Sequence, residues 1–236
     1  MKQEMALTLE IETAVKLLRT GLAELQCIDG ANDFYHLPFL LLSSGFERLM
    51  KCMICLKRRN DTGNYPATNE LKTHDLMDLK NCILSKCISK TTAFRREATK
   101  EDYHFMTADA DFQRLLGILS LFGEFARYYN LDVVTGSTQP TVDAKDRWEK
   151  YEQDLVNKHA ELPNLCQDAN RIDDFYREIN RIIVSKLERF ARALARQFTL
   201  GDLGPKAKSH TGTIGCFLFL TDDGLGRQDY MARRGN

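Results

Sequence analysis

One arginine of this sequence is predicted to lie on an apolar helix face, where its charge requires a partner. At about 100° of rotation per residue, the helix predicted for residues 37–58 places Arg48 in the middle of the face that carries leucines and Cys52. A guanidinium that faces another helix is costly to bury unless it meets a carboxylate, a carbonyl group or a phosphate. The sequence therefore predicts an anionic partner for Arg48, which is either an internal acid such as Asp75 or Asp132, or a bound phosphate.

His74 and Asp75 stand where the next helix is predicted to begin. Asp75 is suited to cap that helix and to face its dipole. A histidine beside an acid is also suited to proton transfer or phosphate contact, which makes His74 an acid/base candidate. Glu47 and Lys51 lie four residues apart on the preceding helix and form an i,i+4 pair. We expect Lys51 to contact phosphate, and Glu47 and Asp75 to support the site.

A Cys-x-x-Cys spacing raises the question of a metal site. Cys52 and Cys55 would need further ligands, for which His74, Cys82 and Cys87 are available. Structural zinc sites commonly use a turn and four committed ligands, whereas this pair lies on a continuous helix. We therefore interpret the seven cysteines as reduced and mostly buried thiols, and we predict no metal and no cofactor.

A second basic feature lies on the helix predicted for residues 168–198. Arg181, Arg189, Arg192 and Arg196 fall within about 80° of one another, opposite the apolar stripe. Such a stripe is either a solvated helix face or a surface that binds RNA phosphates without reading sequence. In the second interpretation Arg189, Arg192 and Arg196 contact the RNA backbone.

The elements that must position these residues are all predicted to be helices. Apolar residues recurring every three or four positions, with polar breaks between them, predict helices over residues 4–27, 37–58, from about 73–75, from 107 to 129, around 148–155 and 168–198. Residues 85–104 show little periodicity and are interpreted as a mobile connection. The fold class is all-α: a helical bundle over residues 1–135, a two-helix extension over 136–200, and an irregular, partly disordered tail over 201–236 with a strand-like run at 214–220.

Bulk composition excludes a strong overall attraction to nucleic acid or membrane. The 236 residues include 33 basic and 33 acidic side chains, so any basic surface must be local. Acidic residues interrupt the N-terminal apolar positions, unlike a signal peptide, and the longest apolar runs are too short to span a bilayer. These features predict a cytoplasmic protein without a membrane partner.

Three segments together resemble the HEPN superfamily of small helical bundles. They are Leu42–Lys51, with its G-x-E-R pattern, Lys72–Leu76, with H-D-L, and Phe122–Asp132. The resemblance covers about residues 5–135 and is greatest to uncharacterised and phage-defence-associated members. It implies a four- or five-helix bundle, frequent homodimerisation, and a role as a metal-independent ribonuclease or as an RNA- or nucleotide-binding module in prokaryotic defence or stress.

The chain departs from that superfamily at the active-site spacing. Active HEPN ribonucleases carry an arginine followed, after roughly four to six residues, by a histidine. Here Asp132 stands where a histidine would follow Arg127. Either the standard chemistry is lost, which leaves a catalytically inactive dimeric interaction module, or Arg48, His74 and Arg127 assemble a site in space. In the second case Arg48 holds the phosphate, His74 transfers the proton, and Arg127, near Asp132, supports the anion.

Overall fold

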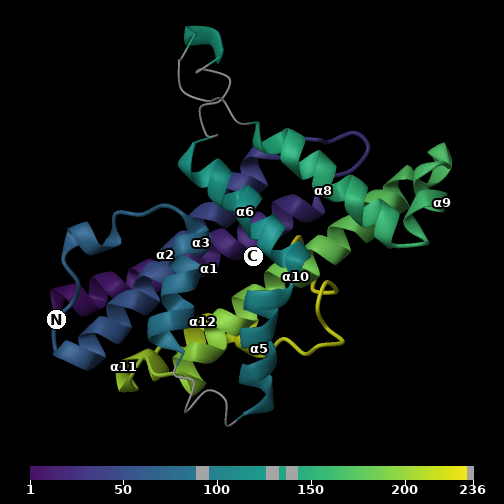
Figure 1. Ribbon diagram of the computed structural model, residues 1–236. Helices are drawn as coiled ribbons and strands as arrows, with labels where there is room; N and C mark the ends of the chain where they lie inside the picture. Colours follow the sequence, from purple (N-terminus) through teal and green to yellow (C-terminus); the bar gives the residue numbers. More distant parts are fainter. Residues whose placement is uncertain (89–95, 126–132, 137–142, 233–236) are drawn as a thin grey trace.

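The protein is all-helical throughout the part of the chain that the computed structural model describes, residues 1–88, 96–125, 133–136 and 143–232 (Figure 1). The α-helices are α1 (Lys2–Gln26), α2 (His36–Thr62), α3 (Leu76–Cys82), α5 (Glu97–Ala108), α6 (Ala110–Glu124), α8 (Ala144–Lys158), α9 (Leu162–Cys166), α10 (Ile172–Leu200), α11 (Pro205–Lys208) and α12 (Thr211–Leu218). Short 3₁₀ turns lie at Thr68–Leu71 and Ala169–Arg171, and a π-helical turn at Ile83–Cys87 extends α3.

Helices α1 and α2 form a closely packed antiparallel pair. A Cβ atom added at Gly45 would lie 2.8 Å from Leu18 Cγ and 3.0 Å from the Leu18 backbone nitrogen. The reciprocal contact occurs at Gly21, where an added Cβ would lie 2.7 Å from Leu42 Cγ. Each helix therefore offers a glycine to a leucine of the other, and the two backbones approach more closely than larger residues would permit.

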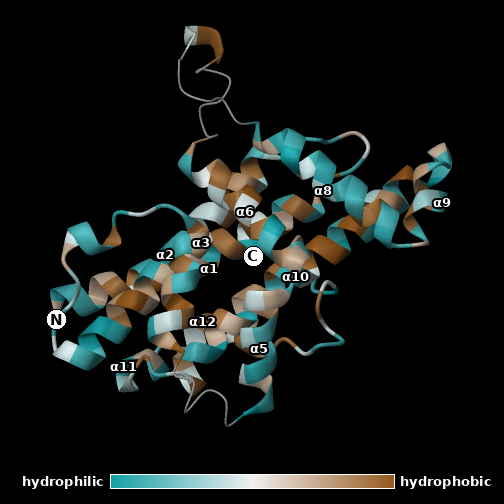
Figure 2. Cartoon of the chain, in the orientation of Figure 1, coloured by the Kyte–Doolittle hydropathy of each residue, from teal (hydrophilic) through white to brown (hydrophobic). Residues whose placement is uncertain are grey.

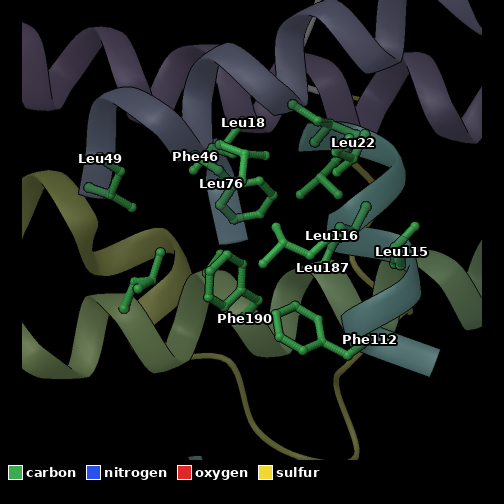
Figure 3. Packing of buried hydrophobic residues seen from close by; sticks show 14 of the residues in the cluster. Leu18, Leu22, Phe46, Leu49, Leu76, Phe112, Leu115, Leu116, Leu187 and Phe190 are labelled. Atoms are coloured by element: carbon green, nitrogen blue, oxygen red, sulfur yellow. The ribbon is translucent and has the colours of Figure 1, made fainter. Parts of the chain in front are cut away.

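The core lies between this pair and helices α6 and α10 (Figure 3). Phe190 of α10 packs against Phe46 of α2, with ring centroids 4.9 Å apart, and against Phe112 of α6 at 4.8 Å. Tilted aromatic pairs at these separations add to the free energy of apolar burial. Helix α10 therefore joins the N-terminal and middle segments of the chain in one core.

The C-terminal segment contains helices that pack on the bundle, which corrects the expectation of a strand-like run. Residues 211–218 form helix α12 rather than a strand-like run, and α12 packs along α10 and α1. Beyond it, Tyr230 donates a hydrogen bond to Glu188 of α10 at 2.8 Å, and its backbone N–H donates to Gln26 of α1 at 3.0 Å. Polar contacts therefore attach the described part of this segment, up to residue 232, to two long helices, and the final residues, for which disorder was expected, lie outside the described residues.

Predicted boundaries agree with the structure to within a few residues for α1, α3 and α10. Helix α5 occupies the last part of the expected mobile connection and continues beyond it to Ala108, with buried Phe105 and Met106 in its last turn. Helix α2 continues to Thr62, where Gly63 ends it with a φ of +77°, a left-handed conformation that favours glycine. Helix α6 begins at Ala110, after its cap Asp109, and ends at Glu124, so it is shorter at both ends than the helix predicted from 107 to 129.

Hydrophobic residues occupy one side of each long helix and hydrophilic residues the other (Figure 2). The buried cluster runs from Ile11 to Tyr230 and includes residues of all three predicted regions. Within the described residues, no helix combines the length and the apolar character that crossing a bilayer requires.

Candidate functional site

A pocket of about 650 Å³ lies between α1, α2 and the segment that precedes α3. Its walls carry both charged and apolar side chains. Those of α1 are Gln3, Ala6, Leu7 and Glu10; those of α2 are Ser44, Glu47, Arg48, Lys51, Cys52 and Cys55; the connecting segment adds Tyr65, Leu71 and His74. The volume is in the range of pockets that hold small organic ligands. The structure thus brings four residues singled out from the sequence, Glu47, Arg48, Lys51 and His74, to one cavity.

Arg48 lines this pocket and is not buried, contrary to the expectation from the helix pattern. Its side chain is 44% exposed and pairs with Glu10 of α1 at 2.5 Å, so neither Asp75 nor any other acid of α3 is its partner. Because Glu10 is itself 41% exposed, solvent screens the pair and its net contribution is small. Arg48 can therefore exchange Glu10 for another anion at low cost.

Glu47 has the least exposed charged side chain of the pocket, and it contacts two neighbouring side chains. Its Oε1 accepts a hydrogen bond from Lys51 Nζ at 2.7 Å and lies 3.0 Å from His74 Nδ1. A carboxylate can only accept, so in the neutral imidazole Nδ1 carries the proton and Nε2 is left as the basic nitrogen. Glu47 therefore orients His74 as a proton acceptor in the way a carboxylate orients a catalytic histidine.

Asp75 has the structural role that its position predicted. Its Oδ1 accepts hydrogen bonds from the backbone N–H groups of Met77 at 2.7 Å and Asp78 at 3.2 Å, which caps α3. The Ser120 hydroxyl of α6 also donates to Asp75 at 2.9 Å and accepts from the Leu76 N–H at 2.8 Å. Asp75 thus supports the site indirectly, by anchoring the helix start beside His74.

The expectation of an open basic face on α10 is wrong. Arg192 is buried and donates to the Leu220 carbonyl at 3.0 Å and to Asp222. Arg196 donates to the buried carboxylate of Asp102 at 2.9 Å. These contacts exist because α5 and the C-terminal segment cover this face of α10.

Arg189, the third arginine of that face, lies with its guanidinium 4.5 Å from the Phe105 ring centroid of α5. It is therefore also covered by α5 rather than presented as part of an open phosphate-binding stripe. The remaining predicted site residues, Arg127 and Asp132, lie outside the described residues.

The cysteines near the pocket behave as thiols of an apolar interior. None of the seven cysteines, all of which are described, forms a disulfide, and only Cys52 and Cys87 are buried, which corrects the expectation that most would be. Burial raises the pKa of Cys52, and it raises the pKa of Cys55 to about 11, so both favour the protonated form at neutral pH. Among the described residues, no three His, Cys, Asp or Glu side chains gather as a metal site would require.

Comparison with models of known protein families, with curated proteins and with solved structures finds no match. The geometry of the pocket therefore carries the functional argument by itself.

Sequence reasoning missed several pocket residues, among them Glu10 and Tyr65. Glu10 is adjacent to Ile11 on the apolar stripe of α1, so an acid at the edge of that stripe was the available signal. Its pairing with Arg48 depends on the antiparallel register of α1 and α2, which the pattern of one helix does not contain. Tyr65 lies in a polar loop, where no periodicity marks it.

Proposed function

We propose that this pocket binds a phosphate ester of RNA or of a nucleotide, and that its enzymatic form is a metal-independent endoribonuclease of HEPN type. The observation that carries the proposal is the convergence of Arg48, Lys51 and a Glu47-oriented His74 on one cavity. Arg48 and Lys51 can donate charge-assisted hydrogen bonds to the oxygens of a phosphodiester, and an imidazole with a free basic nitrogen accepts a proton beside it.

The chemistry requires only RNA and these side chains. His74 Nε2 takes the proton of a ribose 2′-hydroxyl, the 2′-oxygen forms a bond to phosphorus, and the bond to the 5′-oxygen breaks. The His74 imidazolium then gives its proton to the leaving 5′-oxygen and returns to the neutral form, so the products are a 2′,3′-cyclic phosphate and a 5′-hydroxyl. Arg48 and Lys51 stabilise the negative charge that develops on the phosphate oxygens. DNA lacks the 2′-hydroxyl and is not a substrate.

The enzymatic form is tested by incubating the purified protein with mixed RNA in the presence of a metal chelator. We expect cleavage that His74→Ala abolishes and that Glu47→Gln lowers, because the amide orients the imidazole less well. His104→Ala is the matched control, since His104 is an exposed histidine of α5 away from the pocket. Intact RNA, or equal cleavage by wild type and His74→Ala, would exclude the ribonuclease.

The binding function is tested separately by thermal unfolding with and without a nucleoside monophosphate. A ligand that binds only the folded state raises the melting temperature. We expect a rise for the wild type that is lost in Arg48→Ala and kept in Arg58→Ala, which removes an exposed arginine of the same helix outside the pocket. No rise in the wild type with any nucleotide would argue against phosphate binding.

A second candidate function is a catalytically inactive module that acts as a homodimer. It is favoured by Met5 and Leu9, which lie one turn apart on α1 and are 65% and 57% exposed. Light scattering after size exclusion tests it: a dimer that Leu9→Glu converts to a monomer supports this function. A wild-type monomer at all concentrations contradicts it.

A further inference from the structure

The ion pair of Glu10 with Arg48 marks one part of the candidate pocket, which we call the charged end. Because α1 and α2 are antiparallel, Gln3 lies seven residues before Glu10 and Cys55 seven residues after Arg48, toward the same end. At 1.5 Å per residue, these two residues are about 10 Å from the ion pair along the helix axes.

Tyr65 lies in the part of the pocket farther from that ion pair, because its ring is beside Arg59, which follows Arg48 by eleven residues on α2. Leu71 and Leu7 add apolar surface to the pocket wall. The guanidinium of Arg59 lies 5.7 Å from the centroid of the Tyr65 ring, which holds the ring at the pocket wall. Gln3 supplies an amide that can both donate and accept hydrogen bonds.

We propose that the pocket takes a single nucleotide unit, with its phosphate at Arg48 and Lys51 and its base stacked on Tyr65. This inference rests on the proposed phosphate-binding function and adds the base as a second determinant of affinity. A base has an apolar π-face and a polar edge, which match the Tyr65 ring and the Gln3 amide respectively. The pocket of about 650 Å³ admits one such unit rather than a stacked run of bases.

The position of His74 agrees with a nucleotide whose phosphate lies at Arg48 and whose base lies at Tyr65. It hydrogen-bonds to Glu47, one residue before Arg48, so its imidazole lies near the charged end. A nucleotide bound lengthwise therefore places its ribose between the base at Tyr65 and the phosphate at Arg48, next to the imidazole. Double-stranded RNA cannot bind in this way, because its bases remain stacked inside the helix.

The test is calorimetric titration of the full chain with adenosine monophosphate, ribose 5-phosphate and inorganic phosphate. We expect adenosine monophosphate to bind the wild type roughly tenfold or more tightly than ribose 5-phosphate, because stacking of one base has about that effect. Tyr65→Ala should remove this difference and leave ribose 5-phosphate affinity unchanged, whereas Tyr65→Phe should keep it. Arg48→Ala should weaken both ligands.

The outcomes separate this inference from the function on which it rests. Equal affinity of the wild type for adenosine monophosphate and ribose 5-phosphate, or an unchanged nucleotide affinity in Tyr65→Ala, would overturn the base site and leave phosphate binding intact. Absence of binding by all three probes would overturn both.

A competition experiment shows whether the nucleotide unit that the pocket binds belongs to RNA or is a free nucleotide. A single-stranded RNA hexamer that displaces adenosine monophosphate assigns the site to RNA, and a hexamer that does not displace it assigns the site to free nucleotides. A duplex that competes as well as the single strand would contradict the single-unit inference.

Discussion

At the scale of single residues, exposure decides what each ion pair contributes. The pair of Arg48 with Glu10 at the pocket is more than 40% exposed on both sides, so water competes with it. The pair of Arg196 with Asp102 has the same chemistry, but the Asp102 side chain is only 1% exposed. Removing one partner of a buried pair leaves an unpaired charge in the interior.

Removing the arginine of each pair should therefore lower the stability of the protein by different amounts. Arg48→Ala should lower the free energy of unfolding by less than about 1 kcal/mol, whereas Arg196→Ala should lower it by about 3 kcal/mol or more. Urea unfolding of both variants beside the wild type measures the difference. A large loss in Arg48→Ala would mean that Arg48 is a structural residue, which would weaken the case for an available phosphate ligand.

A buried carboxyl group predicts a pH dependence. Glu152 of α8 accepts hydrogen bonds from Trp148 Nε1 at 2.6 Å and from the Tyr35 hydroxyl at 3.0 Å, and burial raises its pKa to about 7. A raised pKa means that folding favours the protonated form. The stability from this group is therefore complete below its unfolded pKa near 4.5 and is lost as the pH rises through about 7.

The corresponding variant is Glu152→Gln, which keeps an acceptor but cannot ionise. Between pH 5 and pH 8 the wild type should lose on the order of 3 kcal/mol relative to this variant, from 1.36 kcal/mol per pKa unit. Denaturant unfolding at the two pH values gives the comparison. The difference between the proteins isolates Glu152 from Asp102 and Glu188, whose pKa values burial also raises. Parallel pH profiles would exclude this assignment.

At the scale of elements, the close crossing of α1 and α2 positions the pocket, because both helices line it. The crossing depends on Gly45, where an added Cβ would lie 3.0 Å from the Leu18 backbone nitrogen, which cannot move aside alone. Gly117 of α6 has no atom within 4 Å of an added Cβ and serves as an internal comparison. A Cβ atom therefore does not fit at Gly45, whereas there is space for one at Gly117.

Alanine substitutions at these two glycines should therefore change stability in opposite directions. Gly45→Ala should cost about 1–3 kcal/mol by overpacking and displace α1 from α2, whereas Gly117→Ala should add about 0.5–1 kcal/mol through helix propensity. Thermal unfolding measures both. Equal stabilisation by the two substitutions would show that the helices do not need the glycine contact.

At the scale of the whole molecule, the C-terminal segment joins helices that are distant in sequence. Glu188 of α10 is fully buried and accepts hydrogen bonds from Tyr230 and from the Gly226 N–H. Gln26 of α1 bonds to the backbone of Gln228 and Tyr230 at 2.8 and 3.0 Å. These contacts attach the end of the chain to the same two helices that α12 covers.

Removal of a single hydroxyl tests this attachment. Tyr230→Phe should lower the free energy of unfolding by about 1–3 kcal/mol, because the buried carboxyl group of Glu188 loses a donor. Tyr65→Phe is the control, since that ring lies at the partly exposed pocket wall and should change stability by less than about 0.5 kcal/mol. A Tyr230→Phe protein as stable as wild type would show that the segment is held by apolar packing alone.

The sequence by itself determined the helical class, most of the long helices and the local caps. Apolar spacing identified α1, α2, α6 and α10, and Asp75 was assigned as a helix start, because periodicity and capping are local properties of the chain. The sequence also selected Glu47, Arg48, Lys51 and His74, which the structure brings to one pocket.

Only the tertiary structure decided which charges are paired and which faces are covered. The helical period put Arg48 toward the core, but the crossing of α1 and α2 leaves it at a pocket rim beside Glu10. The same period put Arg192 and Arg196 toward solvent, but α5 and the C-terminal segment cover them and supply Asp102 and Asp222. Periodicity separates an apolar face from a polar one; whether a polar face meets water or another helix depends on contacts between residues far apart in the chain.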